Sequence, residues 1–145
     1  MTPGILRFMD KQVKILIVEA EMPLAMQMIS VLTHFNYDAD AVHKGKKAME
    51  LAARERFDLI ILDVELPDVP AFEICTELRQ RHISYKTPII FLSTNPTPEK
   101  IAEIKKRGGT DCLPKPFDVT EFIYKVTYYT RARRLMSQES EGIVA

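Results

Sequence analysis

The stretch IILDVELPD, residues 60–68, runs from apolar residues straight into an aspartate, Asp63, and then through a second acid, Glu65, to Leu-Pro. A short apolar run bounded in this way indicates a buried strand. A turn at the end of the strand would explain one acid. A reactive carboxylate beside a cation site would explain both, so the surrounding chain has to decide between the two interpretations.

Outward from this stretch, apolar runs of strand length alternate with amphipathic segments of helical spacing. Strands are expected at 13–18, 37–42, 58–62, 87–93 and 110–116. Helices are expected at 22–35, 45–57, 70–82, 98–107 and 118–130. Such alternation, with central strands apolar throughout, predicts an α/β fold: a parallel sheet with helices on both faces.

Two helix starts carry clear capping signals. Thr97 is the expected N-cap of one helix, with Pro98 at the first helical position and Gly108 near its end. Asp118 and Glu121 form a capping-box pattern before the last helix. Both signals favour helices at these places.

The composition is that of an ordinary globular domain. The chain has 145 residues, 46% of them hydrophobic, and a formal net charge of zero, which argues against a dedicated nucleic-acid or membrane-surface binder. Cys75 and Cys112 match neither a disulfide framework nor a zinc pattern. No signal-peptide pattern or membrane-spanning run is present in the sequence. We therefore expect a cytoplasmic protein with neither nucleic acid nor membrane as a partner.

Polar residues follow several of the expected strands. They are Glu19 and Glu21, on either side of Ala20, after the first, Asp63 after the third, Ser93 at the end of the fourth and Lys115 near the end of the fifth. In an open parallel sheet the carboxyl ends of the strands share one edge, where ligands bind. Carboxylates can hold a hard cation, an aspartate can become an acyl phosphate, and a hydroxyl and an ammonium can stabilise the added oxygens. A phosphoryl-transfer site is therefore expected at this edge.

The same residues carry a family resemblance. The chain resembles the receiver domains of two-component response regulators, of the chemotaxis-regulator type. Four segments match in order: ILIVEAE (15–21), FDLIILDVELPD (57–68), TPIIFLST (87–94) and GGTDCLPKPF (108–117). The resemblance covers about residues 13–130 and implies a flavodoxin-like three-layer sandwich with five helices and strand order 2-1-3-4-5.

Position by position, the resemblance implies a role for each polar residue. Asp63 matches the phosphoacceptor, Glu19 an acid that binds Mg²⁺ together with Asp63, and Glu65 the residue whose backbone carbonyl reaches the metal. Ser93 matches the switch hydroxyl, and Lys115 the lysine that contacts the phosphoryl group, with a cis bond to Pro116. The implied partners are a sensor histidine kinase or phosphotransfer protein and a downstream protein target or linked domain.

Two residues depart from the family pattern. Ala20 stands where a second metal-binding acid is usual, which should weaken Mg²⁺ binding; Glu21 would have to compensate from another direction. Cys112 stands at the switch position, where an aromatic residue is usual, and is too small to fill the same space. These departures favour a second hypothesis, a pseudo-receiver that binds partners without phosphorylation.

An enzyme or a cofactor carrier on a similar fold would need different chemistry. A small phosphatase that uses an aspartyl phosphate needs an acid two residues after the nucleophile, which Glu65 supplies, but it also needs a substrate cap, which this length of chain does not provide. A flavin carrier would not place acids after its first strand. We expect a regulator that is not itself an enzyme. Residues 1–12 are expected to be a lead-in, 13–130 the receiver domain, and 131–145 a helix extension and tail.

The expected output face combines 98–107, 110–116 and 118–130, and a homodimer could form through it. The chain could be a stand-alone regulator, a relay intermediate or a piece of a longer protein.

Overall fold

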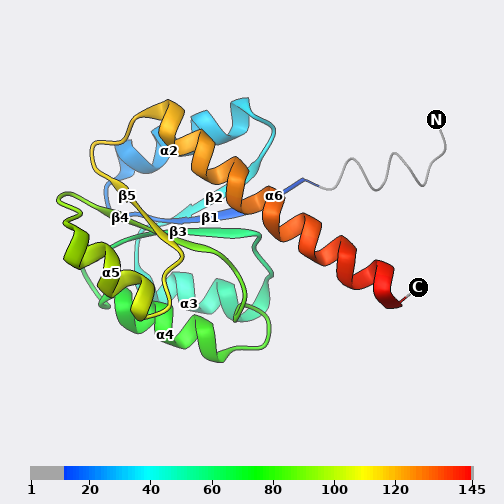
Figure 1. The fold of residues 1–145 in the computed structure, drawn as a ribbon. Helices are drawn as coiled ribbons and strands as arrows, with labels where there is room; N and C mark the ends of the chain where they lie inside the picture. Colours follow the sequence, from blue (N-terminus) through cyan, green and yellow to red (C-terminus); the bar gives the residue numbers. More distant parts are fainter. Residues whose placement is uncertain (1–11, 145) are drawn as a thin grey trace.

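The computed structural model describes the backbone of residues 12–144 and the side chains of residues 12–131. Within that part of the chain, five parallel strands form one sheet in the order β2-β1-β3-β4-β5 (Figure 1). The strands are β1 (Lys14–Val18), β2 (Asp38–Val42), β3 (Leu59–Asp63), β4 (Ile89–Ser93) and β5 (Asp111–Pro114). The helices are α2 (Met22–His34), α3 (Gly45–Arg54), α4 (Ala71–Gln80), α5 (Pro98–Lys106) and α6 (Val119–Val144). The predicted α/β fold, its strand order and its five helices are confirmed.

Helices cover both faces of the sheet, as Figure 1 shows: α2 and α6 lie on one side, and α3, α4 and α5 on the other. Each face has its own apolar core. Met28 of α2 and Phe122 of α6 belong to the first, whereas Ala48 of α3 and Ile74 of α4 belong to the second. The sheet is therefore the middle of three layers.

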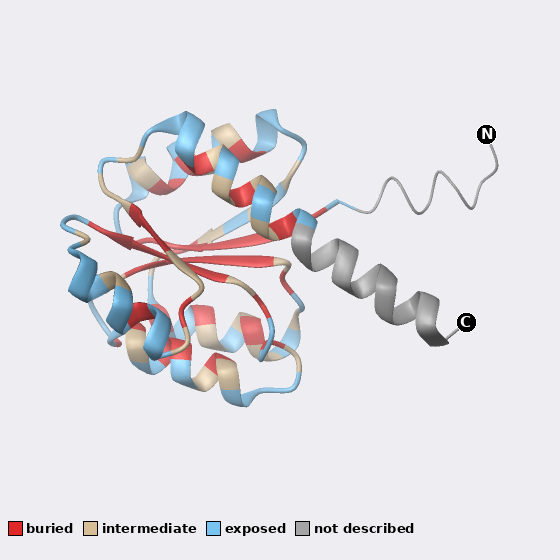
Figure 2. Cartoon of the chain, viewed as in Figure 1, coloured by how far each residue is buried: buried red, intermediate tan, exposed pale blue. Residues whose placement is uncertain are grey.

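The central strands are buried on both faces, which explains why they read as unbroken apolar runs. Along β3, Leu59 and Ile61 pack into one core while Ile60 and Leu62 pack into the other. Figure 2 shows this burial running through the sheet. Fully burying an aliphatic side chain stabilises the fold by about 1.5–3 kcal/mol. The side chains of the sheet therefore contribute most of the hydrophobic stabilisation.

Both predicted helix starts are confirmed by hydrogen bonds. The side chain of Thr97 accepts a hydrogen bond from the backbone N–H of Lys100 at the start of α5. Asp118 accepts one from the backbone N–H of Glu121 at the start of α6. After α5 the chain turns through Gly108, whose φ of 105° is the left-handed conformation that glycine adopts most easily.

The segments expected at the two ends of the chain lie largely beyond the residues whose side chains are described. The lead-in expected at 1–12 lies almost wholly outside the described residues. Helix α6 continues past the sheet to Val144, as an extension of the last helix would. The loss of periodicity expected within 131–145 concerns side chains outside the described residues.

Candidate functional site

Two buried acids emerge side by side where β1 and β3 end. The strands pair in parallel with Val18 opposite Leu62, so the next residues, Glu19 and Asp63, become neighbours. Glu19 is 0% exposed and Asp63 is 1% exposed. Carboxylates are rarely this buried unless a cation or hydrogen-bond donors balance them.

Lys115 supplies that cation from the segment that follows β5. Its ammonium lies 2.7 Å from Oε1 of Glu19 and also pairs with Oδ2 of Asp63. The backbone N–H of Lys115 donates to the carbonyl of Ser93, 2.9 Å away, which ties this segment to the end of β4. The Lys115–Pro116 peptide bond is cis, as the resemblance implied. The structure therefore brings together the three charged residues that the sequence scatters.

Each carboxylate is held by one oxygen and turns the other toward Lys115. Oδ1 of Asp63 accepts a hydrogen bond from the backbone N–H of Glu65 at 2.8 Å. Oε2 of Glu19 accepts one from the backbone N–H of Glu21 at 3.0 Å. Backbone amides thus fix both side chains, and the remaining oxygens of the pair converge on one point.

The charges at this point do not cancel. Burial raises the pKa of Glu19, and the neighbouring Asp63 carboxyl raises it further. Burial by itself lowers the pKa of Lys115, but the carboxylates of Asp63 and Glu19 outweigh that effect and raise it. Lys115 therefore stays protonated at neutral pH, and one ammonium faces two acids.

A cation suits this pair of adjacent acids, which share one ammonium. Oε1 of Glu19 is buried, and within residues 12–131 its ion-pair partner is the Lys115 ammonium, 2.7 Å away. Oxygen ligands of this kind suit Mg²⁺. Yet no group of three His, Cys, Asp or Glu side chains that could hold a metal occurs among the described residues. Glu19 and Asp63 would have to hold the ion with backbone oxygen and water.

The other site residues predicted from the sequence lie around this centre. Ser93 is the last residue of β4 and is 4% exposed. Glu65 has an exposed side chain and reaches the site through its backbone. Ala20 and Glu21 are exposed, and Glu21 contributes its backbone N–H to Glu19.

Cys112 lies inside the apolar core and away from the charged centre. It is 4% exposed and is paired across strands with Phe91. Burial raises the pKa of its thiol. Its cross-strand neighbour, the fully buried ring of Phe91, leaves the small cysteine enclosed.

A polar cluster lies next to Cys112 on the outer edge of β5. Oδ2 of Asp111 accepts hydrogen bonds from the hydroxyl of Tyr129 at 2.6 Å and the ammonium of Lys125 at 3.1 Å. Lys125 also donates to the carbonyl of Cys112 at 2.9 Å. These contacts fasten α6 to β5 beside Cys112.

Two residues near the site were not predicted from the sequence. His43 follows β2, and its Nδ1 lies 2.9 Å from the backbone carbonyl of Glu19. The rule that polar residues gather at strand ends would have found it, had it been applied to the second strand. Asp68, in the loop after Asp63, accepts hydrogen bonds from the backbone N–H groups of Gly45 and Lys46. No local pattern points to that cap, because donors and acceptor are distant in sequence.

Comparison with known proteins identifies similar chains. A family model described as the response regulator receiver domain matches residues 15–127. Response regulator ArlR of Staphylococcus saprophyticus is 40% identical over 114 residues, which are 78% of this chain and 50% of the relative. ArlR of Staphylococcus aureus is 38% identical over the same shares. The chain thus spans about half the length of these curated relatives.

Solved structures agree with the sequence matches. The chemotaxis response regulator CheY4 of Vibrio cholerae is 29% identical, with a TM-score of 0.78 over 82% of this chain and 99% of that chain. The receiver domain of the sensor histidine kinase PA1611 from Pseudomonas aeruginosa is 28% identical, with a TM-score of 0.73 over 82% and 98%. That structure carries a magnesium ion coordinated in its active-site cleft.

Across the part of this chain that the structure describes, none of the helices has the length and apolar character needed to cross a bilayer.

Proposed function

The chain belongs to the response regulator receiver domain family, and on this premise we propose that Asp63 accepts a phosphoryl group from a histidine kinase or a phosphotransfer protein. The observation that carries the proposal is the convergence of Glu19, Asp63 and Lys115 at the carboxyl edge of the sheet. It matches the position at which open parallel sheets bind their ligands.

The contacts of Asp63 suggest which oxygen reacts. Oδ1 is engaged by the backbone N–H of Glu65, whereas Oδ2 faces the ammonium of Lys115. In the proposed transfer, Oδ2 forms the bond to phosphorus while the bond from phosphorus to the donor's imidazole nitrogen breaks. The nitrogen keeps the electron pair and takes up a proton. Lys115 then turns from the carboxylate to the new phosphoryl oxygens.

The remaining site residues would bind the metal ion, orient its ligands and contact the phosphoryl group. Glu19 and Asp63, with the backbone carbonyl of Glu65, would bind Mg²⁺, which supplies positive charge for the incoming phosphoryl oxygens when bound. The backbone N–H of Glu21 keeps Glu19 turned into the site. The hydroxyl of Ser93, at the end of β4, would donate to the phosphoryl group, and its movement would carry the signal outward.

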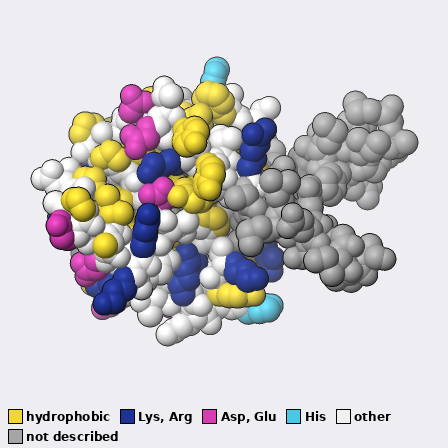
Figure 3. Space-filling view, in the orientation of Figure 1, with side chains coloured by type: hydrophobic (Ala, Val, Ile, Leu, Met, Phe, Trp, Pro, Cys, Tyr) yellow, Lys and Arg dark blue, Asp and Glu magenta, His cyan; other side chains and the backbone are white. Residues whose placement is uncertain are grey.

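The face formed by α5, β5 and α6 is the proposed output surface. Val119, Tyr124 and Tyr128 of α6 are 44%, 69% and 58% exposed. Figure 3 shows apolar side chains interspersed with charged ones on the side of the molecule that α5 and α6 occupy. A partner protein, a linked domain or a second copy could bind such a mixed surface, since exposed aromatic residues are frequent anchors.

A pseudo-receiver is the second candidate function. It is favoured by Ala20 in place of an acid and by the absence, among the described residues, of a three-ligand cluster. In this function the domain would use the same surfaces to bind partners, but Asp63 would not be phosphorylated efficiently.

Intact-mass spectrometry distinguishes the two functions. The full chain is incubated with acetyl phosphate and Mg²⁺, and a phosphoryl mass increment is expected on the native protein but not on the Asp63→Asn variant. Lys105→Met, at an exposed position on α5, serves as the control and should acquire the increment as the native protein does. No increment on the native protein, with no spectral response to Mg²⁺, would support the pseudo-receiver instead.

A further inference from the structure

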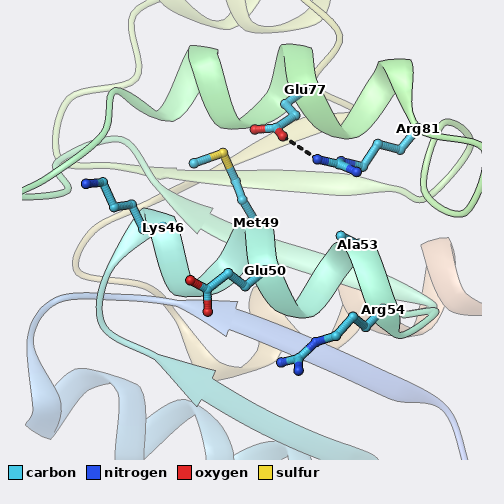
Figure 4. A pocket seen from close by; sticks show the side chains of 7 residues that line it. All are labelled: Lys46, Met49, Glu50, Ala53, Arg54, Glu77 and Arg81. Carbon is cyan, nitrogen blue, oxygen red and sulfur yellow. Dashed lines mark hydrogen bonds and ion pairs between the residues drawn. The ribbon is translucent and has the colours of Figure 1, made fainter.

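An open groove of about 540 Å³ lies between α3 and α4. None of its lining residues belongs to the Asp63 site. They are Lys46, Met49, Glu50, Ala53, Arg54, Glu77 and Arg81. Figure 4 shows Met49 reaching from α3 toward α4, with Lys46 and Arg54 at opposite ends of the α3 segment. Met49 and Ala53 thus form a small apolar strip between Lys46 and Arg54, and charged residues of α3 and α4, Glu50, Glu77 and Arg81, line the same groove.

The charges of the groove are unequally paired. Glu77 is 2.6 Å from Arg81 on the same helix, and Glu50 is 3.8 Å from Lys47. Both acids therefore already have a basic partner. Within residues 12–131, Lys46 and Arg54 lie in ion-pair contact with no carboxylate, although both are exposed. Within this part of the chain, the side chains of Lys46 and Arg54 are thus available to pair with a negatively charged ligand.

The apolar part of the groove is continuous with the protein core. Met49 is half-buried and packs against the core on the α3 and α4 side of the sheet. Methionine adapts its shape to irregular apolar partners. An apolar side chain inserted beside Met49 and Ala53 would complete a surface that already belongs to the core.

The spacing of the cations defines the ligand further. Lys46 and Arg54 are eight residues apart on α3, which corresponds to about 12 Å along a helix at 1.5 Å per residue. A second helix lying along the groove would place acids eight residues apart at the same separation, with an apolar residue midway between them. Helices commonly bind in grooves between helices in this way.

We propose that the groove between α3 and α4 is a docking surface for an acidic amphipathic helix of a partner protein, which inserts an apolar side chain beside Met49 and pairs its carboxylates with Lys46 and Arg54. The groove is also tied to the phosphoacceptor loop. Asp68, five residues after Asp63, holds the backbone N–H groups of Gly45 and Lys46 at the start of α3. These two hydrogen bonds fix the backbone at Lys46, the end of the groove nearest the start of α3.

The test uses a synthetic alanine-rich peptide with leucine at its centre and glutamates four residues to either side, titrated into the unphosphorylated full-length chain. Backbone amide shifts in NMR spectra report binding. Saturable shifts are expected in 46–54 and 77–81, weakening as salt is added. A peptide with lysine in place of glutamate should give no saturable shifts.

Variants locate the contact. The double variant Lys46→Glu, Arg54→Glu should weaken binding about tenfold. The matched double variant Lys105→Glu, Lys106→Glu on α5, with the same change of charge, should bind as the native chain does. If charge reversal unfolds the domain, Lys46→Gln with Arg54→Gln replaces it. The proposal is overturned if the acidic peptide gives no saturable shifts, if the groove variants bind it unchanged, or if the basic peptide binds equally well. Because Asp63 takes no part, these outcomes are independent of phosphorylation.

Discussion

The ammonium of Lys115 lies 2.7 Å from Oε1 of Glu19, and the same ammonium pairs with Asp63. The side chain of Lys115 is only 11% exposed and that of Glu19 only 1%. One lysine is therefore the counter-ion of two buried acids, and the stability of the site and its readiness for a cation both depend on it.

Replacing Lys115 by methionine should destabilise the domain by about 3 kcal/mol at neutral pH, because the substitution leaves two buried carboxylates without a counter-ion. Urea unfolding followed by circular dichroism measures the loss. Lys105→Met, at an exposed position on α5, is the control and should change stability little. A Lys115→Met protein as stable as the native chain at pH 7 would show that the acids are already balanced by other groups.

The loss caused by Lys115→Met should also depend on pH. The folded-state pKa of Glu19 is raised above its ordinary 4.5 by burial and by Asp63. A raised pKa means that the stability contributed by Glu19 is fully present below pH 4.5 and is lost as the pH rises through the folded-state pKa. Without Lys115, the free energy of unfolding falls more steeply as the pH rises through the pKa of Glu19. The difference in free energy of unfolding between Lys115→Met and the native chain should therefore be smaller at pH 4 than at pH 7.

Replacing Ala20 by aspartate should increase Mg²⁺ affinity about tenfold, because ligand charge and number set the affinity of such oxygen sites. Isothermal titration calorimetry on the unphosphorylated chain measures the change. Glu21→Gln is the matched control: its backbone N–H remains, and its exposed side chain is not expected to bind the ion. An unchanged affinity in Ala20→Asp would mean that the ion binds elsewhere or not at all.

Replacing Asp111 by asparagine should destabilise the domain by about 1–3 kcal/mol at pH 7, since a charged acceptor of several hydrogen bonds is lost. Burial acts to raise the pKa of Asp111, but Tyr129, the Cys112 N–H and Lys125 together lower it below 3.8. The stability from a lowered pKa is present above pH 3.8 and is lost as the pH falls through the folded-state value. Unfolding measured from pH 7 down to pH 2 should therefore show the two proteins converging in acid.

The smaller change Tyr129→Phe removes one donor to Asp111 and should cost about 1 kcal/mol. Tyr124→Phe is its control, because the Tyr124 side chain is largely exposed. Equal losses from both tyrosines would contradict a specific role for the hydrogen bond to Asp111.

Replacing Cys112 by phenylalanine should destabilise the domain by about 1–3 kcal/mol, the usual range for overpacking a full core. Cys112 is 4% exposed beside the fully buried ring of Phe91. Thermal unfolding measures the effect, and Cys112→Ala, which adds no volume to the core, is the control for overpacking. A phenylalanine variant as stable as the native chain would show that this position accommodates an aromatic side chain turned outward.

The local signals in the sequence were sufficient for most of the fold. Continuous apolar runs such as 59–62, within the strand expected at 58–62, predicted strands that are buried on both faces, and helices at the predicted places cover them. The hydrogen bond to Thr97 was predictable because a capping motif is made within a few residues. The membership of Glu19, Asp63 and Lys115 in one site followed from a general rule about strand ends.

The sequence by itself determined which side chains are available at the carboxyl edge, because parallel strands must bring their ends to a common side. Only the tertiary structure decided which of them touch. It placed one ammonium between Glu19 and Asp63, set His43 against the backbone of Glu19, joined Asp68 to the start of α3 and enclosed Cys112 beside Phe91. These contacts depend on strand order and helix packing between distant segments, for which no local periodicity carries information.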